Sequence, residues 1–302
     1  MLSSVSGMRG LVVSCLVVWL FSFICGMKQA EYIQKIEIES LWSGRKHIVW
    51  QLDRHVNILS GVNGVGKSTI LNKVVTPLLS APSGSNVKLQ MLLEQTGVTL
   101  DLMPTDADAL RFDVVRSFDR PLVNAELVSR LDFKLASELD LQLFNLQRRY
   151  LDYQVNLGNR IIQMLQSGKP DAPLLAQCLS DNKQLFHDIV DKLFADTAKT
   201  IIRTENEIRF LQMGEVLTPY QLSSGEKQML VILLTVLVED QQPYVLFMDE
   251  PEISLHIEWQ KQLIGIIMQL NPNVQIILTT HSPAVIMDGW MDKVTEVSDI
   301  TV

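Results

Sequence analysis

The chain is poor in cysteine and has no surplus of positive charge. Three cysteines occur among its 302 residues, Cys15, Cys25 and Cys178, and their spacing suits neither disulfide pairs nor a metal site. This excludes a disulfide-stapled secreted domain and favours a reduced, cytosolic protein. The formal net charge of −8 argues against a surface uniformly coated for nucleic-acid binding, although a local basic groove is compatible with that average.

The segment Gly61-Val62-Asn63-Gly64-Val65-Gly66-Lys67-Ser68 has the spacing of a phosphate-binding loop. Apolar residues at 55–59 precede it and an apolar-periodic run at 69–75 follows, which predicts the required order of strand, loop and helix. Backbone N–H groups of such a loop surround phosphate oxygens at a helix N-terminus. We expect Lys67 to contact the β- and γ-phosphates of ATP and the Ser68 hydroxyl to bind Mg²⁺. The expected nucleotide-binding residues here are Gly61, Asn63, Gly64, Gly66, Lys67, Ser68 and Thr69.

A second apolar run, residues 245–248, ends in two acids, Asp249 and Glu250. This pattern is typical of a buried parallel strand whose C-terminal end reaches a ligand crevice. We expect Asp249 to hold Mg²⁺ through water and Glu250 to act as the general base on the attacking water. The alternative is a solvated acidic turn at the end of the strand. The phosphate-binding loop upstream argues against this alternative.

The segment Leu222-Ser223-Ser224-Gly225-Glu226 precedes an apolar-rich run that predicts a helix over 227–238. Ser223 and the Gly225 amide then lie at a helix N-terminus, where anions are favoured. A chain that already holds phosphates at Lys67 has little use for a second anion site on the same nucleotide, but it can use one on a partner's nucleotide. Standing alone, the segment would be an ordinary serine N-cap.

With these motifs in this order, the chain resembles the ABC-type P-loop ATPases, and more closely their SMC/RecF/OLD-like (AAA_21-like) branch. The family signature reads Leu-Ser-Gly-Gly-Gln; Ser224 and Glu226 are variants of it that weaken the match to transporter subunits. The resemblance implies an α/β fold: a P-loop NTPase with an ABC-type ATPase core, an antiparallel β subdomain and an inserted helical lobe. It also implies ATP and Mg²⁺ as cofactors, and a homodimer around ATP in which Ser223 and Gly225 contact the partner's nucleotide.

The same resemblance gives a role to the residues after a further apolar run at 274–280, which predicts a buried strand. His281 follows this run in the register of the family's switch histidine, which contacts the γ-phosphate and orients the water. Residues 254–256 occupy the place of the D-loop, which puts His256 at the dimer interface rather than in catalysis. The Q-loop glutamine and the adenine-contacting residue stay open. The candidates are Gln90 and Gln95 for the first, and Trp42, Trp50, His55 or the basic segment 43–46 for the second.

Roughly 150 residues separate Ser68 from Leu222. Within them, an apolar stripe from 125 to about 157 and another from 181 to 195 predict two helices, separated by the Gly- and Pro-rich segment 168–173. We interpret the two helices as a compact lobe within an insertion at about 123–196. The lobe either packs on the ATPase core or docks a partner.

Shorter elements complete the predicted architecture. Segments 86–102 and 108–118 predict strands of the antiparallel subdomain, next to a first strand at 33–39. One or two short strands are expected within 198–210. A short helix at 284–290 and a closing strand at 294–302 follow the switch histidine. No nuclease or transmembrane module is expected after them, so the effector would be another protein.

The apolar run at residues 11–25 lies between Arg9 and Lys28. It is short for a spanning helix and adequate for the core of a signal peptide. A mis-assigned start, with translation beginning at Met27, is one interpretation. An inner-membrane anchor that leaves the ATPase in the cytoplasm by the positive-inside rule is another. An export signal is the least coherent, because secretion separates an ATPase from ATP. Residues 1–26 are therefore set apart from an ATPase domain at 27–302.

Two function classes remain open. The favoured one is an ATP-hydrolysing switch that acts on DNA or on a co-encoded effector protein, of the repair or anti-phage defence type that the resemblance implies. The alternative is the nucleotide-binding subunit of an ABC membrane transporter, whose helical lobe would receive a coupling helix from a permease. The Glu226-Lys227 ending of the signature and the helical insertion favour the switch.

Overall fold

The computed structural model describes residues 28–42, 44, 46–80, 93, 95–117 and 137–302. Its centre is a parallel sheet with the strand order β11-β3-β10-β9-β5. The strands are β3 (Val56–Ser60), β5 (Phe112–Arg116), β9 (Tyr244–Asp249), β10 (Val274–Thr279) and β11 (Val294–Glu296). Both β9 and β10 are buried along their whole length, because other layers cover both faces of the sheet.

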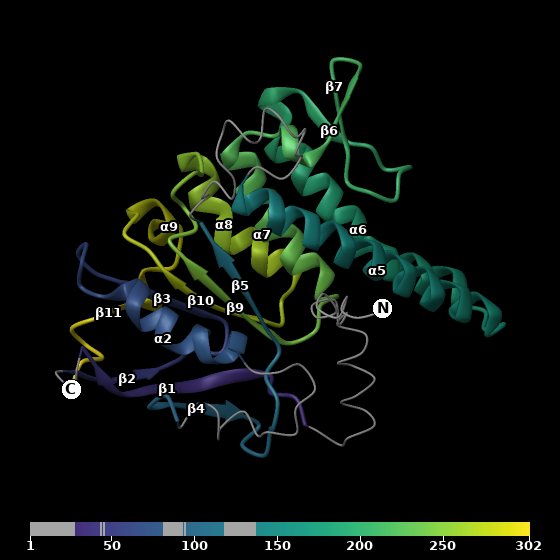
Figure 1. The fold of residues 1–302 in the computed structure, drawn as a ribbon. Coiled ribbons are helices and arrows are strands. Elements are labelled where there is room, and N and C mark those ends of the chain that lie inside the picture. The colour runs from purple at the N-terminus through teal and green to yellow at the C-terminus, as the bar shows by residue number, and fades with distance from the viewer. Residues whose placement is uncertain (1–27, 43, 45, 81–92, 94, 118–136) are drawn as a thin grey trace, which may run out of the picture.

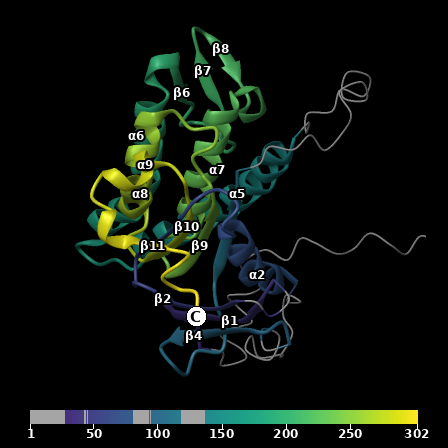
Figure 2. The same ribbon diagram turned by 90° about the vertical axis from the view of Figure 1, so that its left-hand side faces the viewer.

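Alternate residues of β9 enter two different cores. Leu246 and Met248 belong to a cluster with α7 (Ser224–Val238) and α8 (Ile257–Leu270), whereas Val245 and Phe247 pack with α2 (Lys67–Ser80). Side chains of a strand point alternately to its two faces, so one strand joins both cores. Figure 1 and Figure 2 show the resulting layers, with α2 on one side of the sheet and α7 and α8 on the other.

A three-stranded antiparallel sheet forms the base of the molecule in Figure 1. Its order is β2-β1-β4, from β1 (Tyr32–Leu41), β2 (Lys46–Gln51) and β4 (Val98–Met103). The buried Gln275 of β10 ties β1 to the parallel sheet: its amide accepts from Ile33 N at 2.8 Å and donates to Ile33 O at 2.8 Å. The predicted antiparallel subdomain is therefore present, with β1 as expected. Of the strand predicted at 86–102, residues 86–92 and 94 lie outside the described part of the chain.

The strand predicted at 108–118 belongs to a different sheet from the one expected. It forms β5, which pairs in parallel with β9, so its assignment to the antiparallel subdomain is wrong. β5 is an edge strand, and it can therefore carry the polar Asp113, which pairs with Arg149 (Nη1–Oδ1, 2.9 Å). Such mixed polarity is typical of a half-exposed antiparallel strand, which is why the sequence pattern was misleading.

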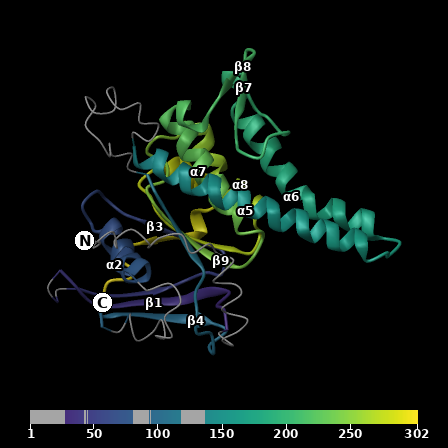
Figure 3. The same ribbon diagram turned by 45° about the vertical axis from the view of Figure 1, so that its right-hand side comes forward.

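The predicted helical lobe is a pair of long helices, α5 (Glu138–Gln166) and α6 (Ala172–Leu193), which project side by side from the core (Figure 3). α5 begins with a capping box in which Ser137 and Asp140 bond each other's backbone, and it continues past the predicted end near 157. Residues 125–136 of the predicted helix lie outside the described residues. α6 starts at Ala172 rather than 181, because Pro173 lies in its first turn, where no N–H is required.

A small antiparallel sheet connects the lobe to the signature segment. It has three strands, β6 (Lys199–Ile201), β7 (Phe210–Gln212) and β8 (Glu215–Leu217), one more than predicted. Short helical turns flank it, η1 (Ala195–Thr197) and η2 (Pro219–Gln221); α9 (Pro283–Met287) and η3 (Met291–Lys293) lie near the C-terminus.

Membrane-spanning helices are not found in the part of the chain that the structure describes, since each helix there is too short or too polar to cross a bilayer. The apolar run at 11–25 lies outside that part.

Candidate functional site

Three strands of the parallel sheet, β3, β9 and β10, end at one pocket of about 380 Å³. Ligands of open α/β sheets bind at this carboxyl edge. The pocket is lined by Trp42, Asn63, Gly64, Gly66, Lys67, Ser68, Thr69, Glu250 and His281. Most residues that the sequence predicts for phosphate binding and catalysis are thus brought together.

The phosphate-binding loop has the backbone that its glycines allow. Gly64 and Gly66 have φ values of +81° and +105°, in the region that side chains disfavour. Lys67 begins α2 and is buried, and its Nζ donates to Gly61 O at 2.9 Å. The ammonium group lies within the loop, where phosphate oxygens could replace the carbonyl as its partner.

Ser68 and Asp249 place a hydroxyl and a carboxylate oxygen side by side next to the pocket. The Ser68 hydroxyl donates to Asp249 Oδ1 at 2.9 Å, and Thr279 Oγ1 donates to the same oxygen at 2.5 Å. Mg²⁺ binds hard oxygen ligands in octahedral geometry, commonly one or two protein oxygens together with phosphates and water. A hydroxyl and a carboxylate already in contact fit this requirement, so Ser68 and Asp249 could hold the ion.

Glu250 and His281 face each other across the pocket. Their side chains approach to 3.4 Å, from Glu250 Oε1 to His281 Nδ1. Glu250 has a φ of +47°, a left-handed conformation that is unfavourable for a residue with a side chain. Its backbone N–H donates to Thr279 O at 3.1 Å, which holds the strained residue in place. Strain of this kind persists where the surroundings enforce it, commonly at functional sites.

Sequence reasoning missed a second acid, Glu252. The residue is buried, with an exposed fraction of 3%, and Oε1 accepts hydrogen bonds from Thr280 Oγ1 and from His281 N. The available signal was the acid two residues after Glu250 in the run Asp249-Glu-Pro-Glu252. An acid in a loop after a strand is usually solvated, so only the burial distinguishes this one.

The signature segment forms the first turn of α7, three residues earlier than the predicted helix start at Lys227. Ser223 is the N-cap, and the Glu226 carboxylate accepts from Ser223 N at 2.9 Å and from its hydroxyl at 2.8 Å. The other oxygen of Glu226 accepts from Lys199 Nζ at 2.8 Å. Burial raises the pKa of Glu226, but the hydrogen bonds from Lys199 and Ser223 outweigh burial and lower it overall.

Gly225 packs against the D-loop of the same chain. A Cβ at this position would lie 2.5 Å from Ser254 O, so no larger residue fits without movement. Ser223 and Gly225 do not line the phosphate-loop pocket, so a single chain does not bring the two halves of the predicted site together. His256 caps α8, with Nδ1 accepting from Glu258 N at 3.4 Å, and it is exposed.

The candidates for the adenine contact differ in burial and in their distance from the phosphate loop. Trp50 is buried in the core beneath the antiparallel sheet, and His55 immediately precedes β3, at the end remote from the phosphate loop. Trp42 lines the pocket, and Lys46 Nζ lies 5.3 Å from its ring centroid. Residues 43 and 45 lie outside the described part. Trp42 is the candidate that the geometry supports.

The Q-loop glutamine is not located. Gln90 lies outside the described residues, and Gln95 lies in an exposed turn before β4 without lining the pocket. Ser117, just after β5, does reach the site, because its hydroxyl donates to Asp249 O at 3.0 Å.

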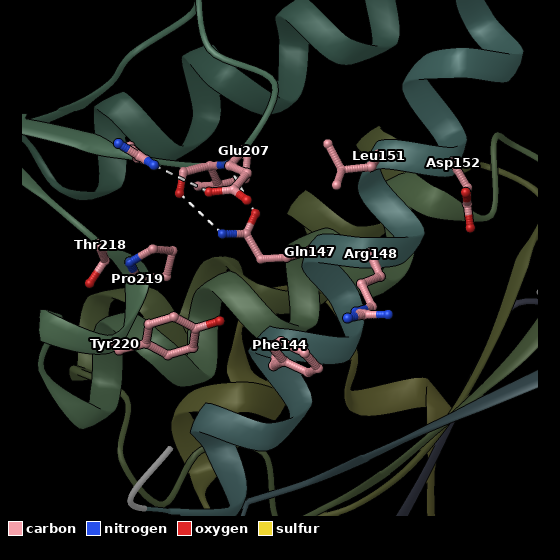
Figure 4. A pocket seen from close by; sticks show the side chains of 11 residues that line it. Phe144, Gln147, Arg148, Leu151, Asp152, Glu207, Thr218, Pro219 and Tyr220 are labelled. Carbon is pink, nitrogen blue, oxygen red and sulfur yellow. Dashed lines mark hydrogen bonds and ion pairs between the residues drawn. The ribbon is translucent and has the colours of Figure 1, made fainter. Parts of the chain in front are cut away.

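A second pocket, of about 580 Å³, lies between α5 and the segments that flank the small sheet (Figure 4). Gln147 of α5 bridges its wall, accepting from Ile208 N at 2.9 Å and donating to Ile208 O at 3.2 Å. Arg148 lies over the Phe144 ring, 4.8 Å from its centroid, and Tyr220 faces them from η2. None of the sequence-predicted site residues lines this pocket.

Comparisons with known proteins identify a family and several similar chains. The family model AAA_21, whose description opens with "AAA domain" and also names an AbiEii toxin and a Type IV TA system, matches residues 126–288. "Septu protein PtuA" of Bacillus thuringiensis is 27% identical over 308 aligned residues, covering 86% of this chain and 74% of that protein. "Retron Vc95 probable ATPase" of Vibrio cholerae serotype O1 biovar El Tor is 24% identical over 130 residues, covering 36% of this chain and 25% of that protein.

Solved structures with similar folds include an SMC head bound to the C-winged helix domain of ScpA, with a TM-score of 0.48, 14% identity, and coverage of 85% of this chain and 92% of that one. The SMC head domain from Thermotoga maritima has a TM-score of 0.44, 14% identity, and coverage of 87% and 94%. The family match spans more than half of the chain and includes Ser223, Glu250 and His281.

Proposed function

The chain belongs to the AAA_21 family, and from that premise we propose that it hydrolyses ATP with Mg²⁺ in an ATP-dependent homodimer and acts as a switch on DNA or on a co-encoded effector. The predicted resemblance to the AAA_21-like branch is confirmed. One observation carries the proposal: the phosphate loop, Glu250 and His281 share a pocket that the signature residues do not reach.

In the proposed reaction, the loop amides and Lys67 bind the β- and γ-phosphates, and Ser68 with Asp249 holds the Mg²⁺ that neutralises their charge. Glu250 takes a proton from the attacking water, and its strained backbone points the carboxylate into the pocket. His281, 3.4 Å from Glu250, contacts the γ-phosphate and orients the water. General base catalysis of this kind typically contributes 10²- to 10⁴-fold.

The second half of the site comes from a second copy of the chain. Ser223 and Ser224 are exposed at the N-terminus of α7, where backbone N–H groups favour an anion. Apolar side chains are exposed on the segments around the pocket: Val62 of the phosphate loop at 76%, and Ile253 and Ile257 of the D-loop region at 47% and 53%. Exposed apolar residues next to an incomplete site support an interface there.

A mixing experiment tests the shared site. Ser223→Arg fills the space that a partner's phosphate must enter, and Lys67→Ala removes the phosphate clamp, so we expect each variant alone to be inactive. A heterodimer of the two contains one composite site with an intact loop and an intact signature. The mixture should regain up to roughly half of the normal sites per heterodimer, with a rate that depends on protein concentration.

Steady-state ATP hydrolysis at several protein concentrations measures this complementation. Circular dichroism confirms that both variants are folded. A mixture that stays inactive although both variants fold and dimerise would show that the head-to-tail site is wrong. Wild-type activity per molecule that is independent of concentration in a monomeric sample would show the same.

The switch role is proposed from the descriptions of the matching family and of the similar proteins. Its family description names a toxin and a TA system, and relatives are named for a Septu system and a retron. We infer that this ATPase works with a separate effector in repair or anti-phage defence.

A further inference from the structure

Glu252 connects the histidine loop to the D-loop. We propose that Glu252 is a positioning residue, which holds His281 at the γ-phosphate and couples it to the dimer interface; this rests on the proposed function. The residue lies in the loop after β9, and its side chain points inward rather than to solvent, with 3% exposed. The reacting groups are Glu250 and His281, and Glu252 acts through the second of them.

One carboxylate oxygen of Glu252 fixes three consecutive residues. Its Oε1 accepts from Thr280 Oγ1 at 2.5 Å and from His281 N at 3.2 Å. The Thr280 hydroxyl in turn accepts from Ser282 N at 2.9 Å. The backbone on both sides of the histidine is therefore set by a single buried acid.

The His281 ring itself has little else to hold it. Its side chain is 46% exposed, and Nδ1 lies 3.4 Å from Glu250 Oε1 and 3.8 Å from Glu252 Oε1. A half-exposed ring without packing on all sides takes its position from its backbone. Misplacement of a catalytic group by about 1 Å can cost on the order of 10²-fold in rate.

The other end of the connection lies in the D-loop. Gln260 Nε2 donates to Glu252 O at 3.3 Å and to Leu255 O at 2.9 Å, and its Oε1 accepts from Ser282 Oγ at 2.7 Å. The D-loop and the histidine loop thus form one hydrogen-bonded unit. Because Ser254 O packs on Gly225, a displacement at the interface is transmitted to His281 through this unit.

The second carboxylate oxygen of Glu252 differs from the first in its hydrogen bonding. Among the described residues, Oε2 of Glu252 has no hydrogen-bond partner although it is buried. Buried polar atoms usually have a hydrogen-bond partner, so an atom without one calls for a specific explanation. The bonds of Oε1 to Thr280 and His281 provide that explanation.

Glu252→Ala and Glu252→Gln together test the proposal in the full-length protein. The amide oxygen of glutamine can accept the same two hydrogen bonds, so Glu252→Gln should keep kcat within a few-fold of wild type. Alanine removes both bonds, so kcat should fall about 10- to 100-fold while the Kd for ATP, measured with a fluorescent nucleotide, changes little. A loss of stability alone would not lower kcat while leaving the Kd for ATP nearly unchanged. It would also not explain why glutamine restores kcat.

Two further variants keep the test decisive. Thr280→Val keeps the shape of the side chain but removes the hydroxyl, and it should lower kcat in the same direction even where Glu252→Ala fails to fold. Asn271→Ala is the control, because Asn271 is fully buried and bonds Gln242 O and Asn273 N before β10, at the sheet edge remote from the site. It should lower the melting temperature and leave kcat unchanged.

Each result bears on either the positioning role or the proposed function. An active Glu252→Ala protein, within twofold of wild-type kcat, overturns the positioning role while leaving the proposed function intact. Glutamine as impaired as alanine overturns the hydrogen-bond explanation. If the alanine variant does not fold, wild-type kcat in Thr280→Val overturns the positioning role. A wild-type protein that binds ATP without hydrolysing it overturns the proposed function, and the role of Glu252 with it.

Discussion

At the scale of single residues, Lys67 and Glu250 line one pocket, and the tasks proposed for them can be separated by substitution. Glu250→Gln keeps the size of the side chain and removes the base, so turnover should slow by roughly 10²-fold or more while ATP still binds. Lys67→Ala removes a charge-assisted contact to phosphate, so it should weaken binding itself. Titration with a fluorescent nucleotide and single-turnover hydrolysis measure the two effects. Retained turnover in Glu250→Gln would remove Glu250 from the role of base.

The predictability of the site also depends on individual residues. Lys67, Ser68, Asp249 and Glu250 could be placed at one site from sequence, because each lies at the end of a strand or the start of a helix within a recognisable motif. His281 could be added through the family resemblance. Glu252 could not, because its importance comes from burial and from bonds to residues that are distant in sequence.

At the scale of elements, the α5–α6 pair contains a buried histidine that makes its packing sensitive to pH. His187 Nε2 and the Tyr150 hydroxyl lie 3.2 Å apart. Burial lowers the pKa of His187 from 6.5 to about 4, and the nearby charges of Lys183 and Arg203 lower it further than Asp191 and Asp188 raise it. The neutral imidazole is therefore the form that the folded lobe accommodates.

This pKa sets the direction of a stability change. The unfolded chain takes up the proton below pH 6.5 and the folded chain only near pH 4, so the contribution is complete above pH 6.5 and is lost as pH falls toward 4. Between pH 7.5 and 5.0 the free energy of unfolding should fall by about 2 kcal/mol more in wild type than in His187→Gln, which does not titrate. Urea unfolding at the two pH values measures the difference. Equal losses in both proteins would contradict the assignment.

Elements also show where sequence reasoning is limited. The predominantly apolar runs of β9 and β10 indicate buried parallel strands, because a strand covered on both faces needs apolar residues on both. β5 was assigned to the wrong sheet, since an edge strand with Asp113 has the same mixed pattern as an antiparallel strand. The start of α6 was placed too late, because Pro173 breaks a helix interior but fits a first turn.

At the scale of the whole molecule, we expect bound ATP to determine whether DNA or a partner protein is retained by the chain. Affinity purification of Glu250→Gln with ATP should retain DNA or a co-encoded soluble partner, because ATP stays bound and the dimer stays closed. Lys67→Ala, which lacks the phosphate clamp, is the matched control and should retain less. Mass spectrometry and nucleic-acid staining identify what is bound. Co-purification with a polytopic membrane protein instead would favour the transporter alternative.

Two ion pairs attach the start of α7 to α5 and to the small sheet that follows α6. Glu226 bonds Lys199 of β6, which follows α6, and the next residue, Lys227, donates to Asp140 of α5 at 2.8 Å. Both pairs are nearly buried, so neither is screened as surface pairs are. The N-terminal end of α7 is therefore coupled to α5 and to the small sheet. In the proposed dimer, where this end meets the partner's ATP, binding at the lobe should change the affinity for that ATP, and by linkage the ATP should change the affinity of the lobe by the same factor.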